Sequence, residues 1–283
     1  MNKWLGVAAL AAALGVAMPA QAAPVTSWNY EISFRFTDAS FTPGVGDPIH
    51  QQFELSWGES GGDFGVPNGT RSALTIGTGP DNHTGGGTVS GTVVTNALSV
   101  PGIGLSNTIT HWNNEISNLY ATLRSGQITS SLTLETSEGV PVVGLPDLTF
   151  DFLFVETLND PPGNPGCADN TPEPCADIFV LVSATSFNVP FTHEGIEYLI
   201  SIFPYTAGGL LGSIATLGPE QCAAAGAAPN CVGIVTDEDA VTTIQFAFAI
   251  TTQPLLVPEP DMLGLLALGL FGVAGVRRTR RAR

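Results

Sequence analysis

The clearest pattern in the chain is an alternation of apolar and polar residues with a period of two, which is typical of half-buried β-strands. It is most regular in WNYEISFRF, residues 28 to 36, where every second residue is aromatic or Ile. We expect these residues to share one buried face: Trp28, Tyr30, Ile32, Phe34 and Phe36. The residues between them are polar, so the opposite face is predicted to meet solvent.

Four further stretches repeat the alternation and predict four more strands. Their apolar residues are Phe53, Leu55 and Trp57; Leu148, Phe150, Phe152 and Phe154; Ile196, Tyr198, Ile200 and Ile202; and Ile244, Phe246, Phe248 and Ile250. Thr- and Val-rich pieces at residues 88 to 95, 128 to 134 and 178 to 183 add three candidates, bounded by Gly, Pro or Asn. Between residues 24 and 256 we identify no stretch with the period of a helix.

Short strands with one apolar face each need a second sheet to cover that face. The pattern therefore predicts an all-β fold, an antiparallel β-sandwich of the jelly-roll or immunoglobulin-like kind, over residues 23 to 256. Two Gly-rich segments and two Cys-containing segments are predicted to be loops of this body: residues 58 to 69, 77 to 87, 163 to 175 and 218 to 233.

The N-terminus has the layout of a secretory signal peptide over residues 1 to 22. Lys3 precedes an apolar run from residue 4 to 18, and Ala20-Gln21-Ala22 supplies the small residues that signal peptidase requires. The run is short for a membrane span and ends in a proline. The mature chain is therefore expected to begin near Ala23, outside the cytoplasm.

The C-terminus holds a second apolar segment, the uncharged run from residue 262 to 276. It is shorter than the roughly 20 residues that span a bilayer comfortably. Five arginines follow it, and moving them across the hydrocarbon is costly, so they are expected to stop translocation. These are Arg277, Arg278, Arg280, Arg281 and Arg283.

Immediately before that run stands Val257-Pro258-Glu259-Pro260. This order of parts, over residues 257 to 283, resembles the PEP-CTERM sorting signal of Gram-negative bacteria. The resemblance implies that the segment enters the inner membrane transiently, that an exosortase cuts near the motif, and that the body then lies at the cell surface or outside the cell. Two prolines bar regular backbone bonding and would present an extended peptide to such an enzyme. A permanent C-terminal anchor is the alternative.

The charge of the body bounds its partners. The chain has 9 basic and 25 acidic residues, and six of the basic ones lie in the two terminal segments. Residues 24 to 256 retain 3 basic and 23 acidic residues, a formal charge of −20. Three arginines cannot assemble the basic face that phosphate binding needs, so a nucleic-acid partner is excluded.

Four cysteines in an exported chain favour disulfides over metal thiolates. We expect local pairs, Cys167 with Cys175 and Cys222 with Cys231, each closing a small loop. Two other connectivities remain open. The spacings fit no common zinc site.

Residues 110 to 116 read THWNNEI. They resemble the T-H-x-N signature of a family of PEP-CTERM proteins, at Thr110, His111 and Asn113, and the resemblance implies an uncharacterised surface domain. His111 could ligate a metal, act as a base, or hydrogen-bond a neighbouring strand or turn. The flanking Thr and Asn favour the last role, in a turn at the edge of a loop.

Calcium is the one cofactor that this acidic composition suggests. The densest acidic cluster is Asp237-Glu238-Asp239, so Asp237 and Asp239 are the candidate ligands. Their spacing differs from that of known calcium loops, and a solvated turn is the alternative.

Together these features predict a non-enzymatic exported protein of the cell surface or extracellular matrix. PEP-CTERM systems are associated with exopolysaccharide production, so the resemblance implies exopolysaccharide and biofilm as its setting, beside signal peptidase and exosortase as processing partners. A carbohydrate-binding module is the alternative, in which an exposed Trp57 or Trp112 would stack on sugar rings. Both are instead expected in the core, since Trp57 continues the face of Phe53 and Leu55. A hydrolase acting on polysaccharide is a further one, although no catalytic motif is present and no pair of carboxylates stands out.

Overall fold

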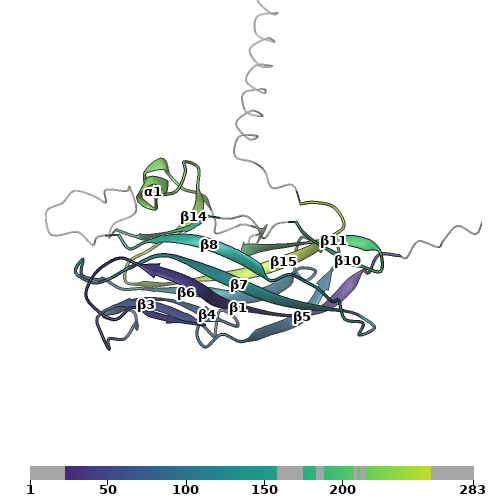
Figure 1. Ribbon diagram of the computed structural model, residues 1–283, viewed down its shortest axis with the longest axis horizontal. Coiled ribbons are helices and arrows are strands. Elements are labelled where there is room, and N and C mark those ends of the chain that lie inside the picture. The colour runs from purple at the N-terminus through teal and green to yellow at the C-terminus, as the bar shows by residue number, and fades with distance from the viewer. Residues whose placement is uncertain (1–22, 158–174, 183–187, 207–208, 211–214, 256–283) are drawn as a thin grey trace, which may run out of the picture.

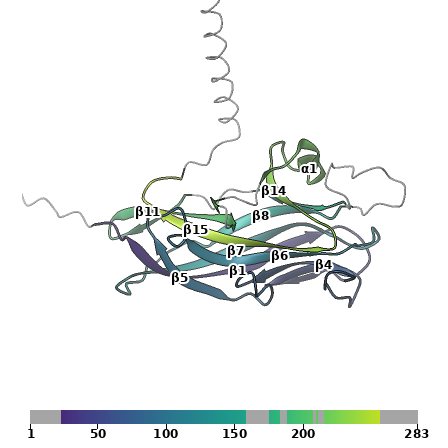
Figure 2. The same cartoon turned by 180° about the vertical axis from the view of Figure 1, so that it is seen from behind.

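The protein folds into two antiparallel β-sheets packed face to face (Figures 1 and 2). The computed structural model describes residues 23–157, 175–182, 188–206, 209–210 and 215–255. The predicted signal peptide, the sorting segment and Cys167 lie outside these residues. The predicted all-β sandwich is confirmed.

The first sheet has seven strands in the order β13-β14-β9-β8-β7-β1-β5. The bounds of these strands are Ala215–Thr216 for β13, Val232–Thr236 for β14, Asp177–Leu181 for β9, Leu148–Val155 for β8, Leu123–Thr136 for β7, Ser27–Phe41 for β1 and Thr88–Val94 for β5.

The second sheet has eight strands, seven of them in the order β10-β11-β15-β6-β4-β3-β2, with β12 paired to β11. Their bounds are Val189–His193 for β10, Ile196–Thr206 for β11, Gly209–Leu210 for β12, Ala240–Thr251 for β15, Gly104–Asn113 for β6, Arg71–Gly77 for β4, Glu54–Gly58 for β3 and Ile49–Gln51 for β2.

The core lies between the sheets and is built from the alternating residues that the sequence pattern identified. On β1 the five predicted positions, from Trp28 to Phe36, are all buried, and the four on β8 are buried as well. Aromatic rings meet edge to face across the layers, for example Phe34 of β1 and Phe246 of β15 at 5.4 Å. Burial of these inward-facing apolar side chains between the sheets is what holds the layers together.

Several strands carry no clean alternation and were not predicted: β2, β4, β6, β10, β14 and the two-residue strands. Strand β4 is buried along its whole length, and on its outer face Thr75 donates to the backbone oxygen of His83 in the following loop. A strand buried on both faces loses the apolar–polar alternation that would reveal it.

The prediction that residues 218 to 233 form a loop without a helix is wrong. Helix α1 spans Pro219–Ala224, begins with a proline at its first turn, and lies beyond β14 at one end of the body (Figure 1). It packs with Leu217 on the outer side of β9, against Ile178 and Val180. Six residues are too few for helical periodicity to show in the sequence.

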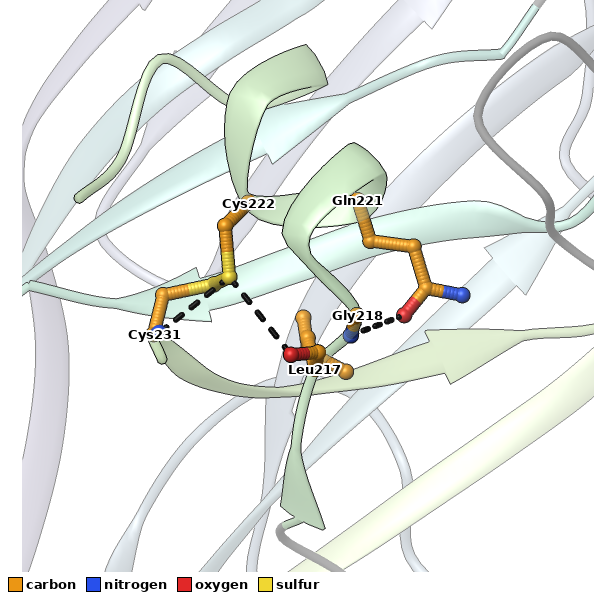
Figure 3. Close-up of a disulfide and its surroundings, with 5 residues drawn as sticks. All are labelled: Leu217, Gly218, Gln221, Cys222 and Cys231. Carbon is orange, nitrogen blue, oxygen red and sulfur yellow. Dashed lines mark hydrogen bonds between the residues drawn. A yellow bond between two sulfur atoms is a disulfide. The ribbon is translucent and has the colours of Figure 1, made fainter. Parts of the chain in front are cut away.

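A disulfide between Cys222 and Cys231 ties α1 to the start of β14, as the local pairing predicted (Figure 3). Cys222 is fully buried. At the start of α1, the side-chain oxygen of Gln221 accepts a hydrogen bond from the backbone N–H of Gly218 at 3.0 Å. Cys175 is also disulfide-bonded. Its predicted partner, Cys167, lies outside the described residues.

Candidate functional site

The T-H-x-N residues occupy the middle of the second sheet, on strand β6 between β4 and β15. The prediction of a turn at the edge of a loop is therefore wrong, and neither Asn113 nor Asn114 has a positive φ. Because side chains alternate along a strand, His111 and Asn113 point into the sandwich, whereas Thr110 and Trp112 point outward. The motif thus contributes to both faces of one sheet.

The two inward residues bind the turn that joins β14 to β15. The imidazole Nδ1 of His111 lies 2.8 Å from the hydroxyl of Thr236. The amide of Asn113 donates to the backbone oxygens of Thr236 and Asp237 at 3.3 and 3.1 Å. The predicted structural role, hydrogen bonding to a neighbouring strand or turn, agrees with these contacts.

The network fixes the tautomer of His111. The hydroxyl of Thr236 also lies 3.4 Å from the backbone oxygen of Asp177, which can only accept. Thr236 therefore donates to Asp177 and accepts from Nδ1–H of His111. This leaves the Nε2 lone pair of His111 facing the Asp177 carboxyl, 3.7 Å from Oδ2.

Two carboxyls of the first sheet complete this buried cluster. Glu156, just after β8, accepts a 2.6 Å hydrogen bond from the indole Nε1 of Trp57, and its Oε1 atom is enclosed. Asp177, the first residue of β9, is fully buried and accepts from the backbone N–H of Thr157 at 2.8 Å. The carboxyls of Glu156 and Asp177 are near enough to influence each other's charge.

Burial keeps these carboxyls protonated. It raises the pKa of Glu156 to about 8, an effect that the bond from Trp57 opposes and the charge of Glu238 reinforces. Burial, with Glu156 and Glu238 nearby, raises the pKa of Asp177 well above its usual range. The two carboxyls titrate as a pair, which retains at least one proton at neutral pH.

His111 is neutral for the same reason, since burial lowers its pKa to about 3. Its approach to Asp177 would be an ion pair only with a protonated ring. Because the ring is uncharged at pH 7, the contact between His111 and Asp177 is not an ion pair there. The ring also lies against Trp57 and Phe154, with centroids 6.0 and 5.1 Å away.

Within the described residues, the hollow that the structure has beside this cluster is small. The hollow beside His111 has a volume of about 10 Å³, roughly that of one water, and is lined otherwise by apolar side chains and Thr236. Acid–base groups with shifted pKa values often mark active sites. Here Asp177 and His111 are buried and Oε1 of Glu156 is enclosed, although Glu156 as a residue is only half-buried, and the groups of the cluster link the two sheets.

The outer side of the motif lies beside an open groove. Trp112 is half-buried, its ring contacts those of Phe64 and His83, and its Nε1 donates to Thr75 at 2.8 Å. Phe64 and Thr75 also line a groove of about 370 Å³ at the β2–β3 end of the sheet. Trp57 is fully buried, as its place on the apolar face of Phe53 and Leu55 predicted, so it is not available to stack on a sugar.

The two aspartates predicted as calcium ligands, Asp237 and Asp239, are not part of the buried cluster around His111. Asp237 and Asp239 are exposed, on either side of buried Glu238. In the part of the chain that the structure describes, no group of three His, Cys, Asp or Glu residues is placed to hold a metal ion. His193 packs edge to face on Trp28 in another part of the core.

Comparison with known proteins concerns the C-terminal segment, where the PEP-CTERM protein-sorting motif matches residues 256–281. The chain carries a PEP-CTERM sorting signal. The signal implies processing by an exosortase, export and sorting to the cell surface. Val257, Pro258, Glu259, Pro260 and the five arginines lie outside the described residues. No curated protein matches the chain. Of the helices in the described part of this PEP-CTERM protein, none has the length and apolar character to cross a membrane.

Sequence reasoning missed Glu156 and Asp177, and it noted Glu238 only as part of an exposed acidic cluster. Glu156 follows β8, Asp177 begins β9 and Glu238 lies in the turn before β15, all places where a carboxylate ordinarily meets solvent. The sequence signal for Glu156 is its position after Phe150, Phe152 and Phe154, since the same alternation places residue 156 on the inward face.

Proposed function

We propose that this PEP-CTERM protein is a non-enzymatic component of the cell surface or extracellular matrix that associates with exopolysaccharide after an exosortase has removed its C-terminal segment. The sorting motif at residues 256–281 is the observation that carries the proposal. It provides a route to the surface, and the charge of −20 on residues 24 to 256 favours a soluble body once the tail has gone.

The absence of catalysis is supported by where the acid–base groups lie. A polysaccharide hydrolase needs two carboxyls on either side of an accessible glycosidic bond. Glu156 and Asp177 have the shifted pKa values expected of such a pair, but Asp177 is fully buried beside His111, and half-buried Glu156 is bonded to Trp57 with its Oε1 atom enclosed. A buried pair that never meets substrate acts on stability rather than on chemistry.

The decisive experiment is the intact mass of the cell-associated and released forms. Cleavage near Glu259 predicts a released species that lacks residues 1 to 22 and the apolar, arginine-ended tail. A Glu259→Ala variant and a host without exosortase should accumulate the longer form in the membrane fraction, whereas Glu238→Ala, inside the body, should leave the cleavage site unchanged in any chain that reaches the membrane.

Surface-displayed protein that still contains residues 262 to 283 would overturn the processing step. The non-enzymatic role has its own test, which is incubation of the released protein with a panel of polysaccharides. Reproducible shortening of any of these chains, in proportion to the amount of protein added, would overturn it.

A further inference from the structure

The groove beside Trp112 lies on the outer face of the second sheet, where three loops meet. Gln52 and Phe53 form the turn between β2 and β3, Phe64 belongs to the loop between β3 and β4, and Thr84 to the loop between β4 and β5. Its volume of about 370 Å³ is within the range of small-ligand sites. We propose that this groove binds a segment of neutral polysaccharide.

The aromatic side chains supply the stacking surface that a sugar needs. Phe53 and Phe64 line the groove, and the ring of Trp112 stands behind Phe64 with a centroid distance of 5.6 Å. Aromatic rings offer large apolar faces, and a sugar ring presents a face of C–H groups that packs against them. Both phenylalanines are half-buried, so each keeps a part of its ring accessible.

These aromatic groups are held in place before any ligand arrives. Phe53 packs on Gly86, where an added Cβ would lie 2.2 Å from the ring. The ring nitrogen Nδ1 of His83 lies 3.2 Å from the Thr110 hydroxyl and 3.3 Å from that of Thr243, and the ring meets Trp112 edge to face. A preformed wall lowers the entropic cost of binding.

Polar groups at the same place match the hydroxyls of a sugar. Gln51 and Gln52 are exposed, and a side-chain amide both donates and accepts, as neighbouring hydroxyls do. The hydroxyl of Ser56 donates a hydrogen bond to Oε1 of Glu54 at 2.8 Å and accepts one from Nη2 of buried Arg71 at 3.0 Å. These two bonds orient the Glu54 carboxylate. This chain of contacts holds an acceptor at the floor of the groove.

Charge decides which polysaccharide fits. Among the described residues that line the groove, Glu54 is an acid and none is a base. A uronate, sulfate or phosphate group would approach a carboxylate on a body that is already strongly acidic. A neutral glycan carries no such penalty, and stacking with amide hydrogen bonds suits it.

The larger groove of the first sheet is a weaker candidate. It has a volume of about 430 Å³ and lies over β1, β5 and β7. Its lining includes Glu31 and Glu135, and its one aromatic residue, Tyr30, is 6 % exposed with its hydroxyl donating to the Leu105 backbone oxygen. Without an accessible ring it offers hydrogen bonds but no stacking surface.

The test uses the mature protein released by its own host and calorimetric titration with soluble neutral glycans (dextran, laminarin, xyloglucan and galactomannan) and with alginate as the anionic comparison. Binding to at least one neutral glycan, weakened about tenfold or more by Phe64→Ala, is the expected result. Gln52→Ala, in an exposed turn, should also weaken it. Phe41→Ala is the matched control, because Phe41 is a half-buried phenylalanine at the end of β1, outside the groove.

Thermal unfolding of each variant checks that the fold is intact, and Gln52→Ala still decides the matter if Phe64→Ala does not fold. No binding to any neutral glycan, binding to alginate alone, or binding unchanged in both groove variants would each overturn the proposal. The inference rests on the proposed function for its setting, but the two fail separately. A correctly processed surface protein that binds no neutral glycan overturns only the groove, and a tail-retaining protein that binds one overturns only the processing.

Discussion

The indole Nε1 of Trp57 donates a 2.6 Å hydrogen bond to Oε2 of Glu156 inside the sandwich. Trp57 belongs to β3 of the second sheet, and Glu156 directly follows β8 of the first sheet. This bond therefore joins the two sheets. Most other contacts between the sheets are apolar, and such contacts do not depend on the direction in which two groups approach each other. A hydrogen bond needs a particular register, so Trp57 and Glu156 help to set how the sheets lie on each other.

The protonated carboxyls predict that stability falls as the pH rises from about 4.5 toward 8. The pKa of Glu156 is about 8 in the folded protein and about 4.5 when unfolded, so its contribution is complete below pH 4.5 and is lost as the pH rises toward 8. The pKa of Asp177 is raised too and acts in the same direction. His111 acts oppositely, because its lowered pKa costs stability only as the pH falls from 6.5 toward 3. Between pH 6.5 and 8, the change of unfolding free energy with pH that this cluster contributes comes from its carboxyls alone.

Glu156→Gln isolates this effect, since the amide copies the shape of a protonated carboxyl and can still accept from Trp57. We expect the loss of unfolding free energy between pH 6.5 and 8 to become smaller by up to about 1.4 kcal/mol per pH unit. Urea denaturation at several pH values measures it. Glu197→Gln, at an exposed position of β11, removes the same charge and should keep the native slope. Equal slopes in the native protein and Glu156→Gln would contradict a protonated Glu156.

The contact between His111 and Thr236 predicts a cost for removing the hydroxyl. Thr236→Val preserves shape but leaves the Nδ1–H donor of His111 buried without its acceptor, which should lower the free energy of unfolding by about 1–3 kcal/mol. Thr192→Val, at an exposed position of β10, makes the same replacement and should change stability little. Equal effects of the two substitutions would mean that the ring does not depend on Thr236.

The Cys222–Cys231 bond closes a short loop, with the two residues nine positions apart. Restricting that loop in the unfolded chain is worth about 2–3 kcal/mol by loop entropy. The double variant Cys222→Ser, Cys231→Ser should lose about that much in urea denaturation under oxidising conditions. Ala223→Ser, on the exposed side of α1, serves as the control. A midpoint equal to that of the native protein would show that the loop is ordered by packing instead.

The close approach at Gly126 predicts intolerance to a single methyl group. A Cβ there would lie 2.4 Å from Cζ of Phe152, whose ring is buried and stacked on Phe179 at 4.8 Å and cannot swing away. Gly126→Ala should therefore cost about 1–3 kcal/mol. Gly79→Ala places its methyl in open space and provides the comparison. Thermal unfolding separates the two, and similar melting temperatures would show that the core absorbs the group.

The sequence by itself determined the features that depend on neighbours in the chain. Period-two alternation identified the inward faces of β1, β8, β11 and β15 because side chains of a strand necessarily alternate. The order of the Pro-Glu-Pro motif, the apolar run and the arginines likewise identified the sorting signal. These parts are neighbours in the chain, because a translocating chain meets the membrane segment by segment.

Only the tertiary structure decided what His111 meets. It brings together His111, Glu156, Asp177 and Glu238 from β6, the ends of β8 and β9, and the turn before β15, and no local pattern records such distant pairings. It also placed the T-H-x-N motif in a central strand instead of the expected turn. The sequence did not reveal this strand because the inward residues His111 and Asn113 are polar, so β6 lacks the usual apolar–polar alternation. Burial, and with it the protonation of the cluster, is a property of how two sheets meet, and one strand alone does not contain it.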